Sequence, residues 1–406
     1  MSNVDSKLFN LILIRYNEIW LKSKKVKSRL IKTLTKNIVF SLNKNQITFH
    51  KYQFSKDFTR ILFFLKNEDI ERAVEVLKNI FGIHSVSPGF RTSSQLENIA
   101  NKALELGEEI LEPNDSFAIR ARRSGKHDFS SQDVANQVGK AFLDRLTELN
   151  LQVNLSSPKK KVFIEVREDF TYLFTKNINS NWGGLPIEEN KHILSINIGR
   201  TTDILSTFLL MRRGCKIHGV IFDLLESTDI NRLSLSIGKV LSKYYNSKSL
   251  IFHIIDFHAI LKEIFSDIVE KEYYCSLCNI IRFKFISTLL SESEHLKKYS
   301  IRGITSGANL ANIGCCPNSI DLDLISTSTK YFSPPIFTPC IGLNSEDIFE
   351  KLKKISPEIE ERSYCPFCPE NQKYTYKSIK NLIKSINLEE IIKKSLKEIK
   401  TINVFL

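Results

Sequence analysis

Residues 181–214 read NWGGLPIEENKHILSINIGRTTDILSTFLLMRRG, and this stretch decides the fold of the C-terminal half of the chain. The run 192–198 is apolar, as a buried strand is, and a helical pattern follows from 203 to 213. Backbone N–H groups bared at such a strand-to-helix turn point at a phosphate, and the helix N-terminus adds partial positive charge. The turn at 198–203 is therefore a candidate phosphate loop, with a plain structural turn as the alternative.

Strands and helices alternate from this stretch onward. Apolar strands are predicted at 192–198, 217–222 and 250–255, with helices at 203–213, 229–246 and 257–271. Alternation of this kind implies parallel strands joined by crossover helices. A ligand is then expected at the carboxyl edge of the sheet, where the candidate loop lies.

Two smaller α+β modules precede this domain. In the first, strands are predicted at 8–16, 48–52 and 60–65, and helices at 22–42 and 71–80. In the second, a strand at 117–122 leads to a helix that is capped by Ser130 or Ser131 and runs to about Leu149, before a hairpin of 162–166 with 171–174. We therefore predict modules at 1–92 and 93–178, a linker at 179–190 and an α/β domain at 191–406.

The positive charge of the chain is concentrated near its beginning. The net charge is +13 over 406 residues, and residues 1–60 alone hold 13 Lys and Arg against 3 Asp and Glu. A surface of this kind suits a phosphate backbone and predicts salt-sensitive binding to nucleic acid. The alternative is that lysine-rich helices merely solvate the surface.

The cysteines indicate a reducing compartment. The sequence contains no run of eighteen apolar residues and no recognisable export signal, so we expect a cytoplasmic protein without a membrane span. Eight cysteines in that setting are read as free thiols, metal ligands or catalytic groups rather than as disulfides.

Four of these cysteines form two CxxC pairs, Cys275 with Cys278 and Cys365 with Cys368. In each pair the spacing lets two thiolates reach one ion. The two pairs together could complete a four-sulfur site for zinc or hold an iron–sulfur cluster. A purely structural metal staple is the alternative to a functional centre.

Several motifs resemble the tRNA 4-thiouridine synthases, a family of tRNA sulfurtransferases. The ends of the opening stretch, GGLPI and MRRG, are similar to the family's GGLPVG linker and MKRG helix end, and residues 15–22, RYNEIWLK, to its RYGEIxLK segment. Residues 117–131 and 164–169 resemble a THUMP domain, an RNA-binding module. The resemblance implies a ferredoxin-like module, a THUMP domain and a doubly wound, mostly parallel nucleotide-binding domain.

The family's activity implies particular partners and site residues. ATP would adenylate a tRNA uridine, and a sulfur carried by a cysteine, here Cys365 or Cys368, would displace AMP. The partners implied are tRNA and a separate sulfur donor, and a homodimer is compatible with the resemblance. The expected nucleotide contacts are Ile196, Asn197, Gly199, Asp203, Ile221, Phe222 and Gly307. The expected RNA contacts are Lys22, Lys24, Arg122, Arg123, Lys126 and His127.

The candidate loop departs from the family's SGGxDS pattern. Of that pattern only Gly199 stands in place, and Arg200 replaces the second glycine, which would let the backbone approach a phosphate closely. The family's acid and second serine fall on Thr202 and Asp203, and Ala308 stands where a later motif carries an acid. We therefore weigh two functions, a tRNA sulfurtransferase and a non-catalytic tRNA-binding protein that has lost its ATP site.

Overall fold

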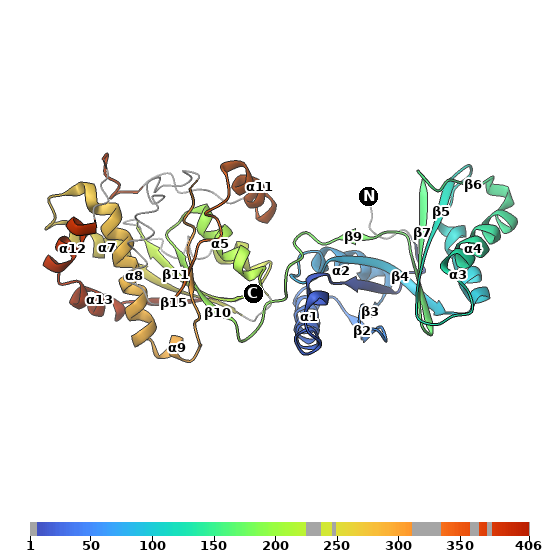
Figure 1. Cartoon of the computed structure of the whole chain (residues 1–406), viewed down its shortest axis with the longest axis horizontal. Helices are drawn as coiled ribbons and strands as arrows, with labels where there is room; N and C mark the ends of the chain where they lie inside the picture. The colour runs from blue at the N-terminus through green and yellow to red at the C-terminus, as the bar shows by residue number, and fades with distance from the viewer. Residues whose placement is uncertain are drawn as a thin grey trace. The chain divides into compact units, whose positions relative to one another are not determined.

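The computed structural model describes residues 6–224, 237–245, 249–310, 334–357, 365–371 and 376–405. The chain divides into two compact units, Met1–Pro186 and Ile187–Leu406, each with its own sheet. Figure 1 shows both units with their helices and strands labelled. No helix within the described residues is long and apolar enough to cross a membrane.

The N-terminal unit contains one nine-stranded sheet that runs through both small modules. The first module consists of β1 (Leu11–Arg15), η1 (Glu18–Leu21), α1 (Lys24–Lys44), β2 (Phe49–Phe54), β3 (Ile61–Leu65), α2 (Asn67–Leu77) and β4 (Ser85–Ser93). The second consists of α3 (Leu96–Ile110), β5 (Ser116–Ser124), α4 (Ser131–Arg145), η2 (Thr147–Leu149), β6 (Gln152–Val153), β7 (Lys160–Arg167) and β8 (Phe170–Phe174), followed by β9 (Ile178–Asn179).

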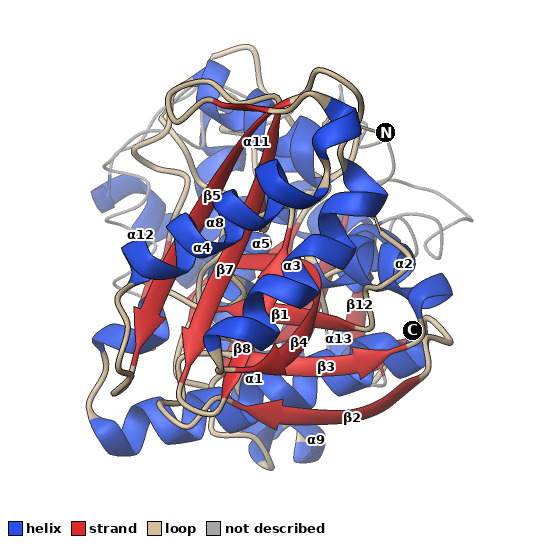
Figure 2. Cartoon of the chain, turned by 90° about the vertical axis from the view of Figure 1, so that its right-hand side faces the viewer, coloured by secondary structure: helices blue, strands red, loops and turns tan. Residues whose placement is uncertain are grey.

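Strand β4 joins the two modules, because it pairs with β1 of the first and with β8 of the second. The predicted boundary at 92/93 falls at the end of this shared strand, so the two modules form a single compact unit. Helices of both modules pack on the sheet through one apolar cluster that includes Ile12, Leu34, Phe117 and Phe142. Figure 2 shows α3 and α4 lying along β5 and β7.

A buried ion-pair network also connects strands of the two modules. Glu165 on β7 contacts Arg15 on β1 at 2.7 Å and Arg60, the residue before β3, at 3.0 Å. It also contacts Arg167 on its own strand at 3.1 Å. Burial raises the pKa of Glu165, but the charges of Arg15 and Arg60 outweigh burial and lower that pKa to about 2. The carboxylate therefore stays ionised and links the two modules across the sheet.

The C-terminal unit contains a six-stranded sheet in the order β14-β13-β10-β11-β12-β15. Its strands are β10 (His192–Asn197), β11 (Lys216–Asp223), β12 (Ser249–Asp256), β13 (Ile304–Thr305), β14 (Ile336–Phe337) and β15 (Lys400–Phe405). Its helices include α5 (Thr201–Met211), α7 (Phe257–Phe265), η3 (Lys271–Tyr273), α8 (Tyr274–Glu292), α9 (Glu294–Lys297), α11 (Ser345–Ile355), α12 (Tyr376–Ser385) and α13 (Leu388–Leu396).

The predicted mixed α/β class is confirmed. Strands β10, β11 and β12 are parallel neighbours. Among the described strands of this sheet, only β15 runs antiparallel, beside β12. The second-module helix ends at Arg145, and a short 3-10 turn takes the place of its predicted last residues. The helix predicted at 229–246 lies largely outside the described residues.

Candidate nucleotide loop and RNA-binding surface

The candidate loop connects β10 to α5 at the carboxyl edge of the C-terminal sheet. Gly199 has a φ of +90°, a backbone conformation that favours glycine, and α5 begins two residues later. The side chain of Asp203, in the first turn of α5, folds back over the loop. Its carboxylate accepts hydrogen bonds from the backbone N–H groups of Ile198 at 3.0 Å and Arg200 at 3.3 Å.

A second segment also donates to this carboxylate. The backbone N–H of Gly307 lies 3.0 Å from Asp203 Oδ1. A Cβ at Gly307 would stand 2.4 Å from the backbone of Thr202 and Asp203, so the close approach requires a glycine. Three of the predicted nucleotide-binding residues, Gly199, Asp203 and Gly307, thus meet at one point.

Arg200 neutralises the carboxylate. Its guanidinium Nη2 lies 2.8 Å from Asp203 Oδ1, and both side chains are at most 2% exposed. A buried ion pair of this kind is held together by charge, because neither group can reach water. Cys340 lies beside the pair and donates to the Thr202 carbonyl, and burial, with a further contribution from Asp203, raises the pKa of its thiol to about 12. This thiol is therefore protonated and inert near neutral pH.

The remaining predicted nucleotide contacts lie on the two central strands. Ile196 and Asn197 end β10, and Asn197 pairs in register with Ile221 of β11, next to Phe222. Asn197 Oδ1 and Thr202 Oγ1 are buried and have no hydrogen-bond partner within the described part of the chain. The polar end of a ligand could satisfy these two atoms.

In this arrangement three backbone donors of the candidate loop region are already taken. A phosphate in such a loop needs the backbone N–H groups as donors, and here the Asp203 carboxylate already takes those of Ile198, Arg200 and Gly307. The sequence predicted that Arg200 would crowd the phosphate position, whereas in the structure Arg200 pairs with Asp203, whose carboxylate accepts from the backbone of the loop.

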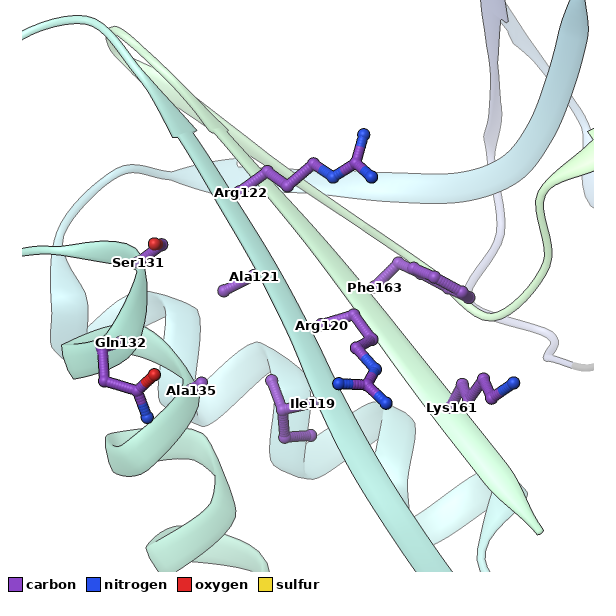
Figure 3. A pocket seen from close by; sticks show the side chains of 9 residues that line it. All are labelled: Ile119, Arg120, Ala121, Arg122, Ser131, Gln132, Ala135, Lys161 and Phe163. Atoms are coloured by element: carbon purple, nitrogen blue, oxygen red, sulfur yellow. The ribbon is translucent and has the colours of Figure 1, made fainter. Parts of the chain in front are cut away.

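The N-terminal unit carries a basic pocket of about 370 Å³ at the beginning of α4. Figure 3 shows Arg120, Arg122, Lys161 and Phe163 projecting from one side of β5 and β7, while Ile119 and Ala121 point toward α4. The parallel register sets Arg120 beside Phe163, so a cation and an aromatic ring lie side by side. Cations next to an aromatic ring are typical of sites that bind nucleic acid.

The RNA contacts predicted from the sequence surround this pocket or lie at the start of α1. The end of β5 and the loop after it expose Arg122, Arg123 and Lys126. Two further exposed cations are Lys22, just before α1, and Lys24, its first residue. The ring of His127 stacks on Phe129 with 5.3 Å between centroids, and its Nε2 is 3.3 Å from the Ser124 carbonyl. His127 is thus tied into the loop, and its predicted contact with RNA stays a prediction.

Comparison with known proteins covers nearly the whole chain. Family models match at residues 11–87 (ThiI ferredoxin-like domain), 93–176 (THUMP domain) and 198–391 (Thiamine biosynthesis protein, ThiI). A probable tRNA sulfurtransferase of Saccharolobus islandicus is 30% identical over 85% of this chain and 86% of the relative. One of Methanosarcina acetivorans is 27% identical over 97% of this chain and 94% of the relative. This chain belongs to the tRNA sulfurtransferase family.

Solved structures agree with that membership at the level of the fold. A 4-thiouridine synthetase in complex with RNA and ATP superposes with a TM-score of 0.80, at 20% identity over 98% of this chain and 100% of that one. PH1313 from Pyrococcus horikoshii gives a TM-score of 0.63 at 24% identity over 85% of this chain. The three-part architecture predicted from the sequence is therefore that of the tRNA sulfurtransferases.

In this member of the sulfurtransferase family, the ring of Phe265 contacts an aromatic residue beside or inside each of the two CxxC pairs. Phe265 stacks on Tyr274, the residue before Cys275, with 3.9 Å between ring centroids, and meets Phe367, inside the second pair, at 5.6 Å. A pocket of about 1150 Å³ is lined by Tyr274, Phe367 and Cys368, among others. Cys368 is exposed on its wall, and Cys365 is buried.

The predicted shared metal site stays a prediction. All four cysteines are described, yet the described residues contain no group of three or more His, Cys, Asp or Glu side chains placed to hold a metal. Cys278 and Cys365 both pack against the apolar cluster of this unit. The donors fit zinc or an iron–sulfur cluster by type, but not in this side-chain arrangement.

Sequence reasoning missed the internal role of Asp203 and the pocket residues Arg120 and Lys161. An acid three residues after the first loop cation is a detectable signal, since i,i+3 side chains meet on a helix. The alternation of Arg120 and Arg122 along a strand was a second signal, because alternate strand residues share one face. Lys161 could not be assigned, because its position depends on the register between β5 and β7.

Proposed function

We propose that this protein binds tRNA through its N-terminal unit. The observation that carries the proposal is the basic pocket at the start of α4, whose lining includes Arg120, Arg122, Lys161 and Phe163. Charged side chains would bind phosphates, and the Phe163 ring, which stacks on Phe174 with 5.3 Å between centroids, would leave only its remaining exposed part for a base. The THUMP match at 93–176 includes every residue of the pocket, and the similar 4-thiouridine synthetase was solved in complex with RNA.

We further propose that the protein acts in the thiolation of a tRNA uridine, as a tRNA sulfurtransferase. Family membership over almost the whole chain supports this candidate, and so does an exposed thiol on a pocket wall. A sulfur carrier must be accessible to its donor and to its acceptor. Cys368 satisfies that requirement, whereas the buried Cys365 suits a resolving or metal-binding role.

A second candidate is a non-catalytic tRNA-binding protein of the same fold. The specific observation in its favour is the Asp203 carboxylate, which takes the backbone donors that ATP phosphates would need. No step through ATP follows from this loop. Under this candidate the C-terminal unit keeps its core and presents tRNA to another protein.

A thiolation assay distinguishes the two candidates. Purified wild-type protein is incubated with unmodified tRNA, ATP, Mg²⁺, a thiol reductant and glutathione persulfide, which passes its outer sulfur to the Cys368 thiolate and leaves as glutathione, and 4-thiouridine is measured by mass spectrometry of the digested tRNA. A sulfurtransferase forms 4-thiouridine, and Cys368→Ser abolishes the product while leaving tRNA affinity unchanged. A binding protein retains tRNA in a gel-shift experiment but forms no product. Failure to bind tRNA at low salt would contradict both candidates.

A further inference from the structure

An exposed aromatic residue stands just before the basic helix α1. Trp20, in η1, is 53% exposed, its neighbour Leu21 is 81% exposed, and Phe58 in the β2–β3 turn is 54% exposed. Tryptophan is highly buried on average in folded proteins, so a half-exposed ring needs an explanation. All three residues belong to the N-terminal unit, and exposed apolar side chains of this kind indicate a surface that contacts a partner.

Lys27 fixes the position of the Trp20 ring. Its Nζ lies 3.4 Å from the ring centroid, which is a close cation–π contact. The β2–β3 turn lies against the segment before η1, because the Tyr16 hydroxyl donates a hydrogen bond to the Phe58 carbonyl. Burial lowers the pKa of Lys27, and the charge of Asp57 in the same turn opposes that shift. The ring, the ammonium and the turn that carries Phe58 therefore lie on the same side of the unit. One face of the indole is covered by Lys27 while half of the side chain stays open to solvent.

The charge around the ring points to an anionic partner. Residues 22–36 contain seven Lys or Arg and no Asp or Glu, and three of these cations, Lys24, Lys25 and Lys27, lie in the first turn of α1. Cations at a helix N-terminus oppose the helix dipole and repel one another. Such an arrangement costs stability in the isolated protein, and a bound polyanion would offset that cost.

We propose that Trp20 is a stacking platform for an unpaired base of RNA, with the adjacent phosphates bound by Lys22, Lys24 and Lys25. Aromatic rings interleaved with cations are the means by which proteins hold single-stranded nucleic acid with little sequence preference, since every base has a π face. An acidic protein segment would pair with the lysines but has no comparable use for a half-open indole. The inference rests on the proposed tRNA binding and adds a second contact, on the first module.

Tryptophan fluorescence tests the stacking directly. The chain contains two tryptophans, so Trp182→Phe leaves Trp20 as the sole emitter. We expect saturable quenching of this variant by unmodified tRNA, at the concentrations that saturate a gel shift. A variant with Trp20→Phe and Trp182 intact provides the comparison and should show little quenching. If Trp182→Phe is misfolded, the difference between wild type and Trp20→Phe gives the same quantity. Unchanged Trp20 emission at saturating tRNA would overturn the proposal.

Affinity provides the second measurement. Trp20→Ala should weaken tRNA binding roughly tenfold, and Trp20→Phe, which keeps a ring, should restore most of it. Val269→Ser, at an 87% exposed apolar position of the C-terminal unit, is the matched control and should bind as wild type does. If wild type binds tRNA and Trp20→Ala binds equally well, the platform is refuted while tRNA binding stands. If wild type does not bind tRNA, the proposed function itself fails.

Light scattering tests whether a second copy of the chain, rather than RNA, covers the Trp20 ring. Trp20→Ala and wild type should have the same molar mass in the absence of RNA. A dimer of wild type that Trp20→Ala converts to a monomer would show that a second copy covers the ring, and the RNA platform would be withdrawn.

Discussion

At the scale of single residues, Arg200 and Asp203 determine whether the backbone N–H groups of the candidate loop are open to a ligand. A glycine-rich phosphate loop leaves its N–H groups open, because glycine has no side chain to occupy them. Here Arg200 and Asp203 stand on the same side of the first turn of α5 and neutralise each other. The Asp203 carboxylate thus accepts the hydrogen bonds that the loop would otherwise donate to a bound phosphate. The family resemblance and the loss of the second glycine were visible in the sequence, whereas the carboxylate that occupies the donors became visible only with the fold.

A double-mutant cycle measures this internal pair. Asp203→Asn and Arg200→Met should each lower the free energy of unfolding of the C-terminal unit by about 3 kcal/mol, since each leaves a buried charge without its partner. The double variant should cost less than the sum of the single changes, because neither charge is then left alone. Urea unfolding monitored by circular dichroism gives all three values. Additive effects would contradict a direct Arg200–Asp203 interaction.

At the scale of secondary-structure elements, three neighbouring strands and one short helix bring four histidines together. His192, His218 and His253 lie on β10, β11 and β12, and His295 lies on α9. His192 Nδ1 is 3.0 Å from His218 Nε2, and Tyr299 packs against His192, His218 and His295. Burial, reinforced by the other three histidines and by Lys216, lowers the pKa of His218 to about 3. Burial, with His295, lowers that of His253 to about 4.

The histidine cluster predicts that the C-terminal unit is sensitive to acid. Because the folded-state pKa values are lowered, the unfolded chain binds more protons below its own pKa of about 6.5. Stability is therefore complete above that pH and falls as the pH drops toward 4 and then 3. Each such histidine contributes a slope of about 1.4 kcal/mol per pH unit.

Unfolding free energies at pH 7.5, 5.5 and 5.0 test this slope. His218→Gln, which cannot be protonated, should reduce it by about one proton relative to wild type. His50→Gln is the matched control, because His50 is exposed on β2 of the other unit. An identical slope in His218→Gln and wild type would contradict the assignment.

The two CxxC pairs are also a question of secondary-structure elements, because the packing of the segments that carry them determines whether the four thiols can reach one metal. The prediction made from the sequence, a shared centre, requires the four thiols to move closer than they lie in the structure. Wild-type protein purified without chelator would then hold about one zinc ion or one iron–sulfur cluster per chain, and Cys278→Ser would lose it. Elemental analysis and absorbance near 400 nm provide the measurement. Cys215→Ser, at a buried cysteine outside both pairs, should retain the metal. Metal-free wild type would contradict the prediction.

Elements differ in how far the sequence could predict them. Strands β10, β11 and β12 were predictable because each is a short, mostly apolar run. Helix α8 was not, because Leu277, Ile280, Phe283 and Phe285 are buried on several of its sides and no single apolar face repeats. Strand β15 was missed for a different reason. Its partner β12 lies about 150 positions earlier, and pairing over such a separation leaves no local signal.

At the scale of the whole molecule, chemistry is divided between the two units. The N-terminal unit provides the basic pocket and the lysines of α1, and the C-terminal unit contains the loop, the histidines and the CxxC pairs. The charge count of residues 1–60 predicted a basic surface on the first module, and the motifs predicted the ferredoxin-like, THUMP and nucleotide-binding-like parts. The single sheet that joins the first two modules could not be predicted, because the pairing of β4 with β8 connects segments of separate motifs.

Replacing Arg122, Arg123 and Lys126 together by Ala should weaken tRNA binding more than tenfold, about 1.4 kcal/mol. The affinity of wild type should also fall steeply as salt rises, since these side chains displace counterions from phosphates. Fluorescence anisotropy with labelled tRNA measures both effects. The control replaces three cations of α11, Lys351, Lys353 and Lys354, and should leave binding unchanged. Equal affinity of the first triple variant and wild type would refute an RNA role for this segment.

The most direct test of the account is a calorimetric titration of wild-type protein with Mg²⁺–ATP, with and without saturating tRNA. Because Asp203 occupies backbone donors of the candidate loop, the closed loop predicts that tRNA binding saturates while ATP shows no saturable binding up to millimolar concentration, and this result would favour the non-catalytic candidate over the sulfurtransferase. Saturable ATP binding at micromolar concentration, alone or with tRNA, would contradict the closed loop and would establish a working nucleotide site.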